Sequence, residues 1–175
     1  MAPFGLCQWS FSKLLFASPS ATLGPALKVY MSGRSTILVA DDDQNDVFFL
    51  RRAFQKSGVS HAVIHVSDGQ EAIDYLLGEA GYADRARFPV PVLVLLDLKM
   101  PKVDGFDVLA WLRTRPELES LPVVVLSSSS REDDIQRART LGAADYRVKP
   151  ADFDELMILA QEVATRWLNT SRVPG

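Results

Sequence analysis

The chain alternates short apolar runs with helical patterns from Thr36 onward, and this order constrains its fold more than any other feature. Three of the runs are almost uniformly apolar, which is typical of strands that helices cover on both faces. Between the runs, apolar residues recur at helical spacing, as in Val47, Leu50 and Phe54. The strands are expected at Ile37 to Ala40, Ala62 to Val66, Val92 to Leu96, Val123 to Leu126 and Asp145 to Val148.

This alternation predicts an α/β protein whose strands form a parallel, doubly wound sheet. The helix after the fourth strand is expected to begin at a capping box, in which Ser129 reaches forward and Glu132 reaches back. That helix should end near Gly142.

The composition excludes several classes of protein. The chain has 175 residues, enough for one domain with a sizeable core but short for two. With 47% hydrophobic residues and a net charge of -3, it is unlike a basic nucleic-acid binder. Its single cysteine, Cys7, cannot form an internal disulfide, and His61 and His65 make no convincing zinc site. No apolar stretch reaches the roughly 20 residues of a membrane-spanning helix. We therefore expect a cytoplasmic protein without direct nucleic-acid or membrane partners.

The first 34 residues differ from the rest because they contain no acidic residue. A signal or transit peptide is disfavoured, since Ser12, Lys13 and Pro19 interrupt any apolar core. Met31 stands just ahead of the first strand, so an alternative is that the native protein starts there. The domains are expected to be a loosely ordered extension at 1–34, a folded domain at 35–170 and a tail at 171–175.

Polar residues follow the predicted strands at the edge where doubly wound sheets bind ligands. They are Asp41, Asp42 and Asp43 after the first strand, Asp97 after the third, Ser127 after the fourth and Lys149 after the fifth. Two like charges about 4 Å apart repel by about 4 kcal/mol at an effective dielectric near 20, so clustered aspartates need a cation. Magnesium prefers oxygen ligands and is usually held by one or two carboxylates together with phosphate oxygens. The sequence therefore predicts a Mg²⁺ site.

Asp97 follows the apolar run "VLVLL" and precedes "LKMPKVDG", in which Pro101 and Gly105 shape a turn. An aspartate at a rigid strand end can attack phosphorus and form an acyl phosphate. A metal ion and the point charge of Lys149 would neutralise the incoming oxygens.

In this order, these motifs resemble the receiver domain of bacterial two-component response regulators, which has the flavodoxin-like fold of CheY. The matching stretches are "ILVADDD", "LVLLDLKMPKVDG", "PVVVLSSS" and "GAADYRVKP". The resemblance spans roughly Thr36 to Leu168 and implies a (βα)5 sheet with parallel strands in the order 2-1-3-4-5. The loop before the third strand, "SSSSREDDI" and the late "RWL" also resemble small stand-alone receivers that are paired with bacterial phytochromes.

The resemblance implies that a histidine kinase or a phosphotransfer protein donates a phosphoryl group to Asp97. It implies that Asp42, Asp97 and the backbone carbonyl of Lys99 hold Mg²⁺, while Asp41 acts mainly through a metal-bound water. Many receivers lack a positive charge at position 99. The ammonium of Lys99 would therefore contact the phosphoryl group or compete with the metal, which bears on metal affinity and phosphoryl lifetime.

The resemblance also implies a switch. Ser127 and Lys149 would bind phosphoryl oxygens, and the shift of Ser127 would let Tyr146 turn inward. For Tyr146, a plain surface aromatic is an equally good alternative. Asp43 is expected to cap the first helix, and Asp104 and Asp107 are expected to cap the third.

The last predicted helix carries two apolar stripes, which are more than packing on a sheet requires. We expect a homodimer or partner surface there, with a broadly buried terminal helix as the alternative. The stripes consist of Phe153, Met157, Ala160, Ala164 and Trp167, and of Leu156, Leu159 and Val163.

The chain ends soon after Leu168, so the expected protein is a single-domain switch that signals to a separate downstream protein. One rival is a phosphatase of the haloacid dehalogenase type, which needs a second aspartate at the position of Lys99. Another is an interaction module that is not phosphorylated, which the set of Asp42, Asp97, Ser127 and Lys149 disfavours.

Overall fold

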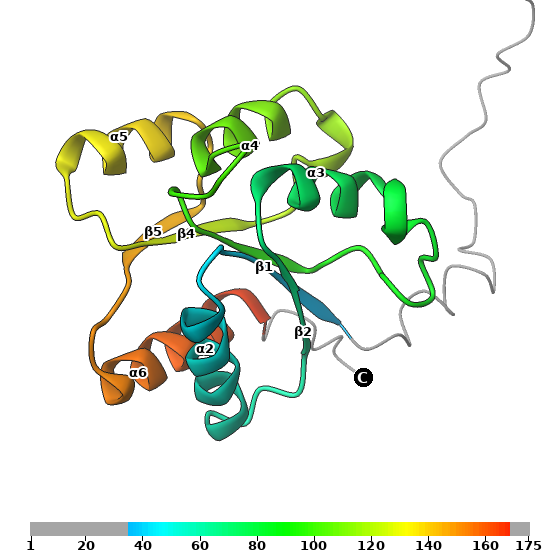
Figure 1. Cartoon of the computed structure of the whole chain (residues 1–175). Coiled ribbons are helices and arrows are strands. Elements are labelled where there is room, and N and C mark those ends of the chain that lie inside the picture. Colours follow the sequence, from blue (N-terminus) through cyan, green and yellow to red (C-terminus); the bar gives the residue numbers. More distant parts are fainter. Residues whose placement is uncertain (1–34, 169–175) are drawn as a thin grey trace, which may run out of the picture. The chain divides into compact units, whose positions relative to one another are not determined.

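The computed structural model of the chain describes residues 35–168. The predicted extension, the alternative start at Met31 and the predicted tail lie outside the described residues. Five parallel strands form one sheet in the order β2-β1-β3-β4-β5 (Figure 1), which confirms the predicted flavodoxin-like order. The strands are β1 (Thr36–Ala40), β2 (Ala62–Val66), β3 (Leu93–Leu96), β4 (Val123–Ser127) and β5 (Asp145–Val148).

Helices cover both faces of the sheet. In Figure 1, α2 and α6 lie below it, and α3, α4 and α5 lie above it. Each layer has its own apolar core, because alternate residues of the central strands point to opposite faces: Ile37 and Val39 join the core of α2 and α6, and Leu38 and Ala40 join the other. The helices are α2 (Gln44–Lys56), α3 (Gly69–Leu77), α4 (Gly105–Leu112), α5 (Glu132–Thr140) and α6 (Phe153–Val163), with 3₁₀ turns η1 (Ala80–Tyr82) and η2 (Pro116–Leu118) and a π-helical turn, η3 (Ala164–Leu168).

The register of the two central strands sets the position of the residues that follow them. Ala40 of β1 is paired with Leu96 of β3. The ladder continues beyond this pair, since the N–H of Asp97 donates to the carbonyl of Ala40 over 2.9 Å, and that of Asp41 donates to Val66 over 3.1 Å. Two aspartates therefore leave the sheet side by side from hydrogen-bonded backbone.

All five predicted strands are found, each within one residue of its expected ends. Every residue of β1, β3 and β4 is buried. Burial on both faces is the reason that their sequences are so uniformly apolar.

The predicted capping box of α5 is wrong. The helix begins at Glu132, with Arg131 as its N-cap residue, so Ser129 lies too far upstream to cap it. The Ser129 hydroxyl instead lies 2.5 Å from the carboxylate of Asp134, and Glu132 accepts from Gln136. The predicted end is correct, because α5 stops at Thr140 and Gly142 follows with φ of +93°.

Both apolar stripes of α6 contribute to the core that this helix shares with α2. Leu159, Ala160 and Val163 are buried, and the five remaining stripe residues are half-buried against the same core. The alternative of a broadly buried terminal helix accounts for these stripes, although Ile158 remains 57% exposed. Among the described residues, no helix is long and apolar enough to span a membrane.

Candidate functional site

Three carboxylates meet at the carboxyl edge of the sheet, where β1 and β3 end. Asp41 and Asp97 are buried and Asp42 is exposed. One oxygen from each lies within 4.8 Å of the others, a spacing that could hold a metal ion. The strand order reverses between β1 and β3, which is where sheets of this class bind their ligands.

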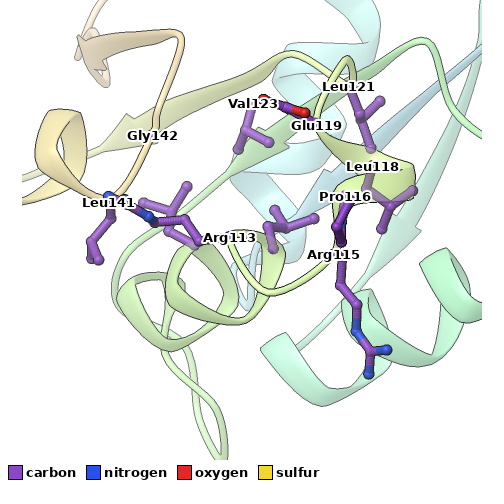
Figure 2. A pocket seen from close by; sticks show the side chains of 11 residues that line it. Arg113, Arg115, Pro116, Leu118, Glu119, Leu121, Val123, Leu141 and Gly142 are labelled. Carbon is purple, nitrogen blue, oxygen red and sulfur yellow. The ribbon is translucent and has the colours of Figure 1, made fainter.

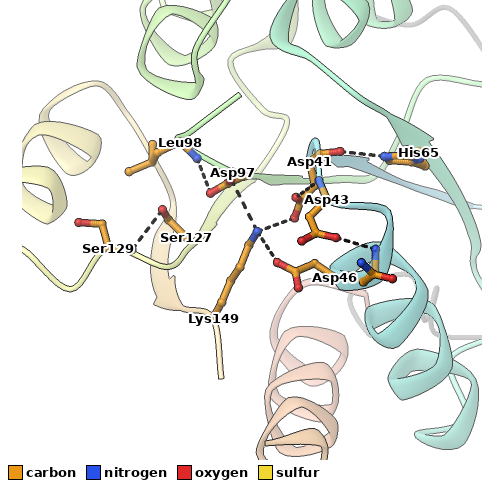
Figure 3. Close-up of polar contacts among 10 residues, drawn as sticks. Asp41, Asp43, Asp46, His65, Asp97, Leu98, Ser127, Ser129 and Lys149 are labelled. Carbon is orange, nitrogen blue, oxygen red and sulfur yellow. Dashed lines mark hydrogen bonds and ion pairs between the residues drawn. The ribbon is translucent and has the colours of Figure 1, made fainter. Parts of the chain in front are cut away.

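Lys149 follows β5 and brings an ammonium group into this cluster (Figure 3). Its Nζ lies 2.8 Å from Oδ2 of Asp41, 2.8 Å from Oδ2 of Asp46 and 3.6 Å from Oδ2 of Asp97. The four side chains come from three strand ends and the first turn of α2, so only the folded chain brings them together.

Burial and charge act in opposite directions on these groups. Burial disfavours the charged form of Lys149, but hydrogen bonds to Asp41 and Asp46 and the charge of Asp97 outweigh it and raise its pKa above the usual range. The lysine is therefore a fixed positive charge. Burial raises the pKa of Asp41, although the Lys149 ammonium opposes this shift. The carboxylate of Asp41 thus pays a desolvation cost that a second cation would reduce.

The backbone fixes one oxygen of each buried carboxylate. Oδ1 of Asp97 accepts from the N–H of Leu98 over 2.8 Å, and Oδ1 of Asp41 accepts from the N–H of Asp43 over 3.1 Å. The second oxygen of Asp41 is bonded to Lys149, whereas that of Asp97 has, among the described residues, only the longer contact of 3.6 Å to the same ammonium. Oδ2 of Asp97 is therefore the more available of the two second oxygens.

The donor set fits a hard divalent ion such as Mg²⁺, because it consists of carboxylate oxygens without sulfur or imidazole.

The loop that carries Lys99 is closely packed: a Cβ on Gly105 would lie 2.2 Å from the carbonyl oxygen of Asp97. In the same loop Lys102 has φ of +63°, and its ammonium lies 2.6 Å from the buried carboxylate of Asp68. The side chain of Lys99 is exposed, and the role of its carbonyl as a ligand stays a prediction.

The two predicted switch residues lie close together in the fold. Ser127 is fully buried at the end of β4, and its Oγ accepts from the N–H of Ser129 over 3.4 Å. Tyr146 is 8% exposed and donates its hydroxyl to the carbonyl of Ser129. The alternative of a plain surface aromatic is wrong for Tyr146, which points inward in this structure.

The predicted caps Asp43 and Asp104 are confirmed, whereas Asp107 is a residue of the first turn of α4 and not its cap. Asp43 is the N-cap residue of α2 and accepts from the N–H of Asn45 over 2.8 Å. Asp104 caps α4 in the same way, with Asp107 as the donor of the N–H.

Two contacts of the site were not predicted. Asp46 contacts Lys149, but an acidic residue in the first turn of a helix is already favoured by the helix dipole, so nothing in the sequence pointed to a second role. His65 is a residue of β2, as expected, and its Nε2 lies 2.8 Å from the backbone carbonyl of Asp41. Nothing in the sequence indicates this pairing, which depends on the register of β1 and β2.

Two cavities lie at opposite ends of the strands, one at their carboxyl ends and one at their amino ends. One, of about 280 Å³, adjoins the carboxylate cluster and is lined by Asp41, Asp46 and Lys149 together with apolar residues of α2 and α6. The larger, of about 420 Å³, lies beyond Val123 at the start of β4 and contains Arg113 and Arg115 (Figure 2). Only the smaller cavity shares residues with the carboxylate cluster.

Comparisons with known proteins agree with this geometry. The chain is 36% identical over 140 residues to the probable methanogenesis regulatory protein FilR2 of Methanothrix harundinacea, which covers 79% of this chain and 87% of that protein. It is 33% identical over 139 residues to the response regulator Rcp1 of Synechocystis, covering 79% of this chain and 92% of Rcp1.

Solved structures give the same result. The phosphorylated cyanobacterial phytochrome response regulator RcpA is 37% identical with a TM-score of 0.72, and 81% of this chain covers 99% of it. The Mn²⁺-bound form of Rcp1 has a TM-score of 0.70 over the same shares of the two chains. The narrower similarity to phytochrome-associated regulators is therefore confirmed. Residues 37–161 match the family described as the response regulator receiver domain. The chain therefore belongs to the receiver domain family of two-component response regulators.

Proposed function

We propose that this protein accepts a phosphoryl group on Asp97 from a phosphohistidine of a histidine kinase or a phosphotransfer protein. The observation that carries this proposal is the position of Asp97. Within residues 35–168, its Oδ2 accepts from no backbone N–H, and it lies 3.6 Å from a lysine ammonium, inside a cluster of oxygen ligands. The oxygen attacks phosphorus, the bond from phosphorus to the histidine nitrogen breaks, and an acyl phosphate forms.

Asp42 and Asp97, with the backbone carbonyl of Lys99, are the proposed Mg²⁺ ligands, and Asp41 is proposed to act through a metal-bound water. When bound, Mg²⁺ would supply positive charge to the phosphoryl oxygens. Lys149 supplies a second positive charge, because its Nζ lies 3.6 Å from Oδ2 of Asp97 and its pKa stays above the usual range. Ser127 is proposed to donate its hydroxyl to a phosphoryl oxygen.

Ser127 and Tyr146 are proposed to transmit the conformational change that follows phosphorylation. Both contact Ser129: Ser127 accepts from the N–H of Ser129, and Tyr146 donates to the carbonyl of Ser129. A shift of Ser127 toward a phosphoryl oxygen would therefore alter the hydrogen bond that holds Tyr146. This would bias the surface formed by α5 and β5 toward or away from a downstream protein.

Partner contact is supported by exposed aromatic side chains beside the site. Phe48 and Phe49 of α2 are 59% and 46% exposed, and Phe49 lines the smaller cavity with Asp41 and Lys149. Exposed apolar groups of this size mark interaction surfaces when they gather in one place. The single-domain organisation, cytoplasmic location and homodimer through the last helix remain predictions.

Lys99 is proposed to modulate the site. Its ammonium either contacts the phosphoryl group or competes with the metal, and the variant Lys99→Gln separates the two. Tighter Mg²⁺ binding would indicate competition, whereas a changed phosphoryl lifetime at saturating Mg²⁺ would indicate contact. We also propose that residues of this site assist the hydrolysis of the acyl phosphate on Asp97, so that the protein contributes to its own dephosphorylation.

Incubation with acetyl phosphate and Mg²⁺ tests the proposal directly. The intact mass should increase by one phosphoryl group in the wild-type protein and in Asp104→Asn, but not in Asp97→Asn or after removal of Mg²⁺ by a chelator. Absence of incorporation in the wild-type protein would contradict the proposal. Sustained turnover of varied phosphate esters would instead support the phosphatase alternative.

A further inference from the structure

Asp46 shares the ammonium of Lys149 with the carboxylate cluster but is not part of that cluster. It is the third residue of α2, and its Oδ2 lies 2.8 Å from Nζ of Lys149. The two residues lie 103 positions apart in the sequence. The side chain of Lys149 is only 15% exposed, whereas that of Asp46 is 45% exposed.

The distances show to which side the lysine is held. An ammonium group has three N–H donors. Asp41 and Asp46 lie at hydrogen-bond distance from Nζ, whereas Asp97 lies at 3.6 Å. The ammonium therefore lies closer to Asp41 and Asp46 than to the proposed phosphoacceptor, and Figure 3 shows its contacts with all three.

A role in the helix alone does not explain this contact. A carboxylate in the first turn of a helix interacts favourably with the helix dipole. Asp107 has the same third position in α4 and is exposed, so that position does not require a lysine partner. Asp46 additionally binds a cation that comes from the end of β5.

We propose that Asp46 is a positioning residue that competes with the phosphoryl group on Asp97 for the ammonium of Lys149. This inference rests on the proposed function. Lys149 must loosen its bond to Asp46 in order to approach a phosphoryl oxygen, so this carboxylate lowers the affinity of the site for the phosphoryl group. Asp41 competes less once its carboxylate also serves a metal ion.

Binding of beryllofluoride, an analogue of the phosphoryl group, measures this competition when followed by fluorine NMR at saturating Mg²⁺. Asp46→Asn should raise the affinity about threefold to fivefold, the size expected for loss of a half-exposed ion pair. The matched control is Asp43→Asn. It removes the same charge from the same turn, and asparagine serves equally well as an N-cap.

The control separates competition from a general effect of charge, because Lys149 also acts on Asp43 through space. An affinity gain confined to Asp46→Asn supports the proposal. Equal gains in both variants, or no gain in Asp46→Asn, would overturn it. If the wild-type protein binds beryllofluoride, Asp97→Asn does not, and Asp46→Asn binds it with the wild-type affinity, this inference alone is contradicted. Absence of binding in the wild-type protein contradicts the proposed function and this inference with it.

Discussion

The hydroxyl group of Tyr146 donates a hydrogen bond of 2.8 Å to the backbone carbonyl of Ser129. This bond joins β5 to the loop between β4 and α5, at a residue whose N–H also contacts Ser127. Burial raises the pKa of Tyr146, so the hydroxyl stays protonated and remains a donor. Through Ser129, this contact connects Ser127 in the proposed phosphoryl site to Tyr146 of β5.

Replacing Tyr146 with phenylalanine keeps the ring and removes this bond. We expect the free energy of unfolding to fall by about 1 kcal/mol, because the Ser129 carbonyl loses its partner. We also expect beryllofluoride to cause smaller NMR shifts in α5 and β5, with little change in its affinity. Urea unfolding and nitrogen–proton NMR spectra measure the two effects.

Tyr75→Phe is the matched control, since its hydroxyl donates to the carbonyl of Pro89 over the same 2.8 Å, on the other side of the sheet's centre. It should lose similar stability and keep the full NMR response. Equal responses in the two variants would exclude a switch role for Tyr146.

The three consecutive aspartates should separate into different roles. Asp43→Ala removes the N-cap of α2 and should cost about 1 kcal/mol of stability. Asp43→Ser should restore most of it, and both variants should bind Mg²⁺ nearly as well as the wild-type protein. Asp42 is exposed, so Asp42→Ala should leave stability nearly unchanged while weakening Mg²⁺ binding about tenfold or more, on the order of one lost charged ligand. Calorimetric titration and thermal unfolding test this division. Weaker Mg²⁺ binding in Asp43→Ala and lower stability in Asp42→Ala would contradict this assignment of roles.

Lys102 should affect how stability depends on pH. Burial alone would raise the pKa of Asp68, but hydrogen bonds from the Lys102 ammonium and the Glu71 N–H lower it below 3.8. A carboxyl whose pKa is lowered in the folded state stabilises the fold above its unfolded pKa, and this contribution is lost as pH falls through the folded pKa.

Lys102→Met should therefore lower stability at neutral pH, and the deficit should shrink as the pH falls below 3.8. Acid unfolding should begin at a higher pH in the variant. Lys99→Met, from the same loop, is the control for loss of a surface charge. Parallel stability curves for Lys102→Met and the wild-type protein would exclude the contribution of this ion pair.

The strands were predictable because burial on both faces leaves a simple signal. The runs around Val94 and Val124 can be read as strands without their neighbours. The caps Asp43 and Asp104 were predictable for a similar reason, since each acts within its own segment of chain.

Contacts between distant segments were harder to predict. The bond between Asp46 and Lys149 depends on how α2 packs against the end of β5, and local sequence does not record that packing. The capping box failed because α5 begins later than the box requires: Arg131 rather than Ser129 is the N-cap residue, and the Ser129 hydroxyl bonds to Asp134 instead. Tyr146 was hard to predict as well, because its inward position depends on the Ser129 carbonyl.

The most direct test of the account is to locate the phosphoryl group itself. The phosphorylated protein is reduced with borohydride, which converts an aspartyl phosphate to homoserine, and the modified peptide is identified by mass spectrometry. The account predicts homoserine at position 97 alone, and none in Asp97→Asn. Homoserine at position 41 or 42, or a stable phosphoryl group on a serine, would contradict it.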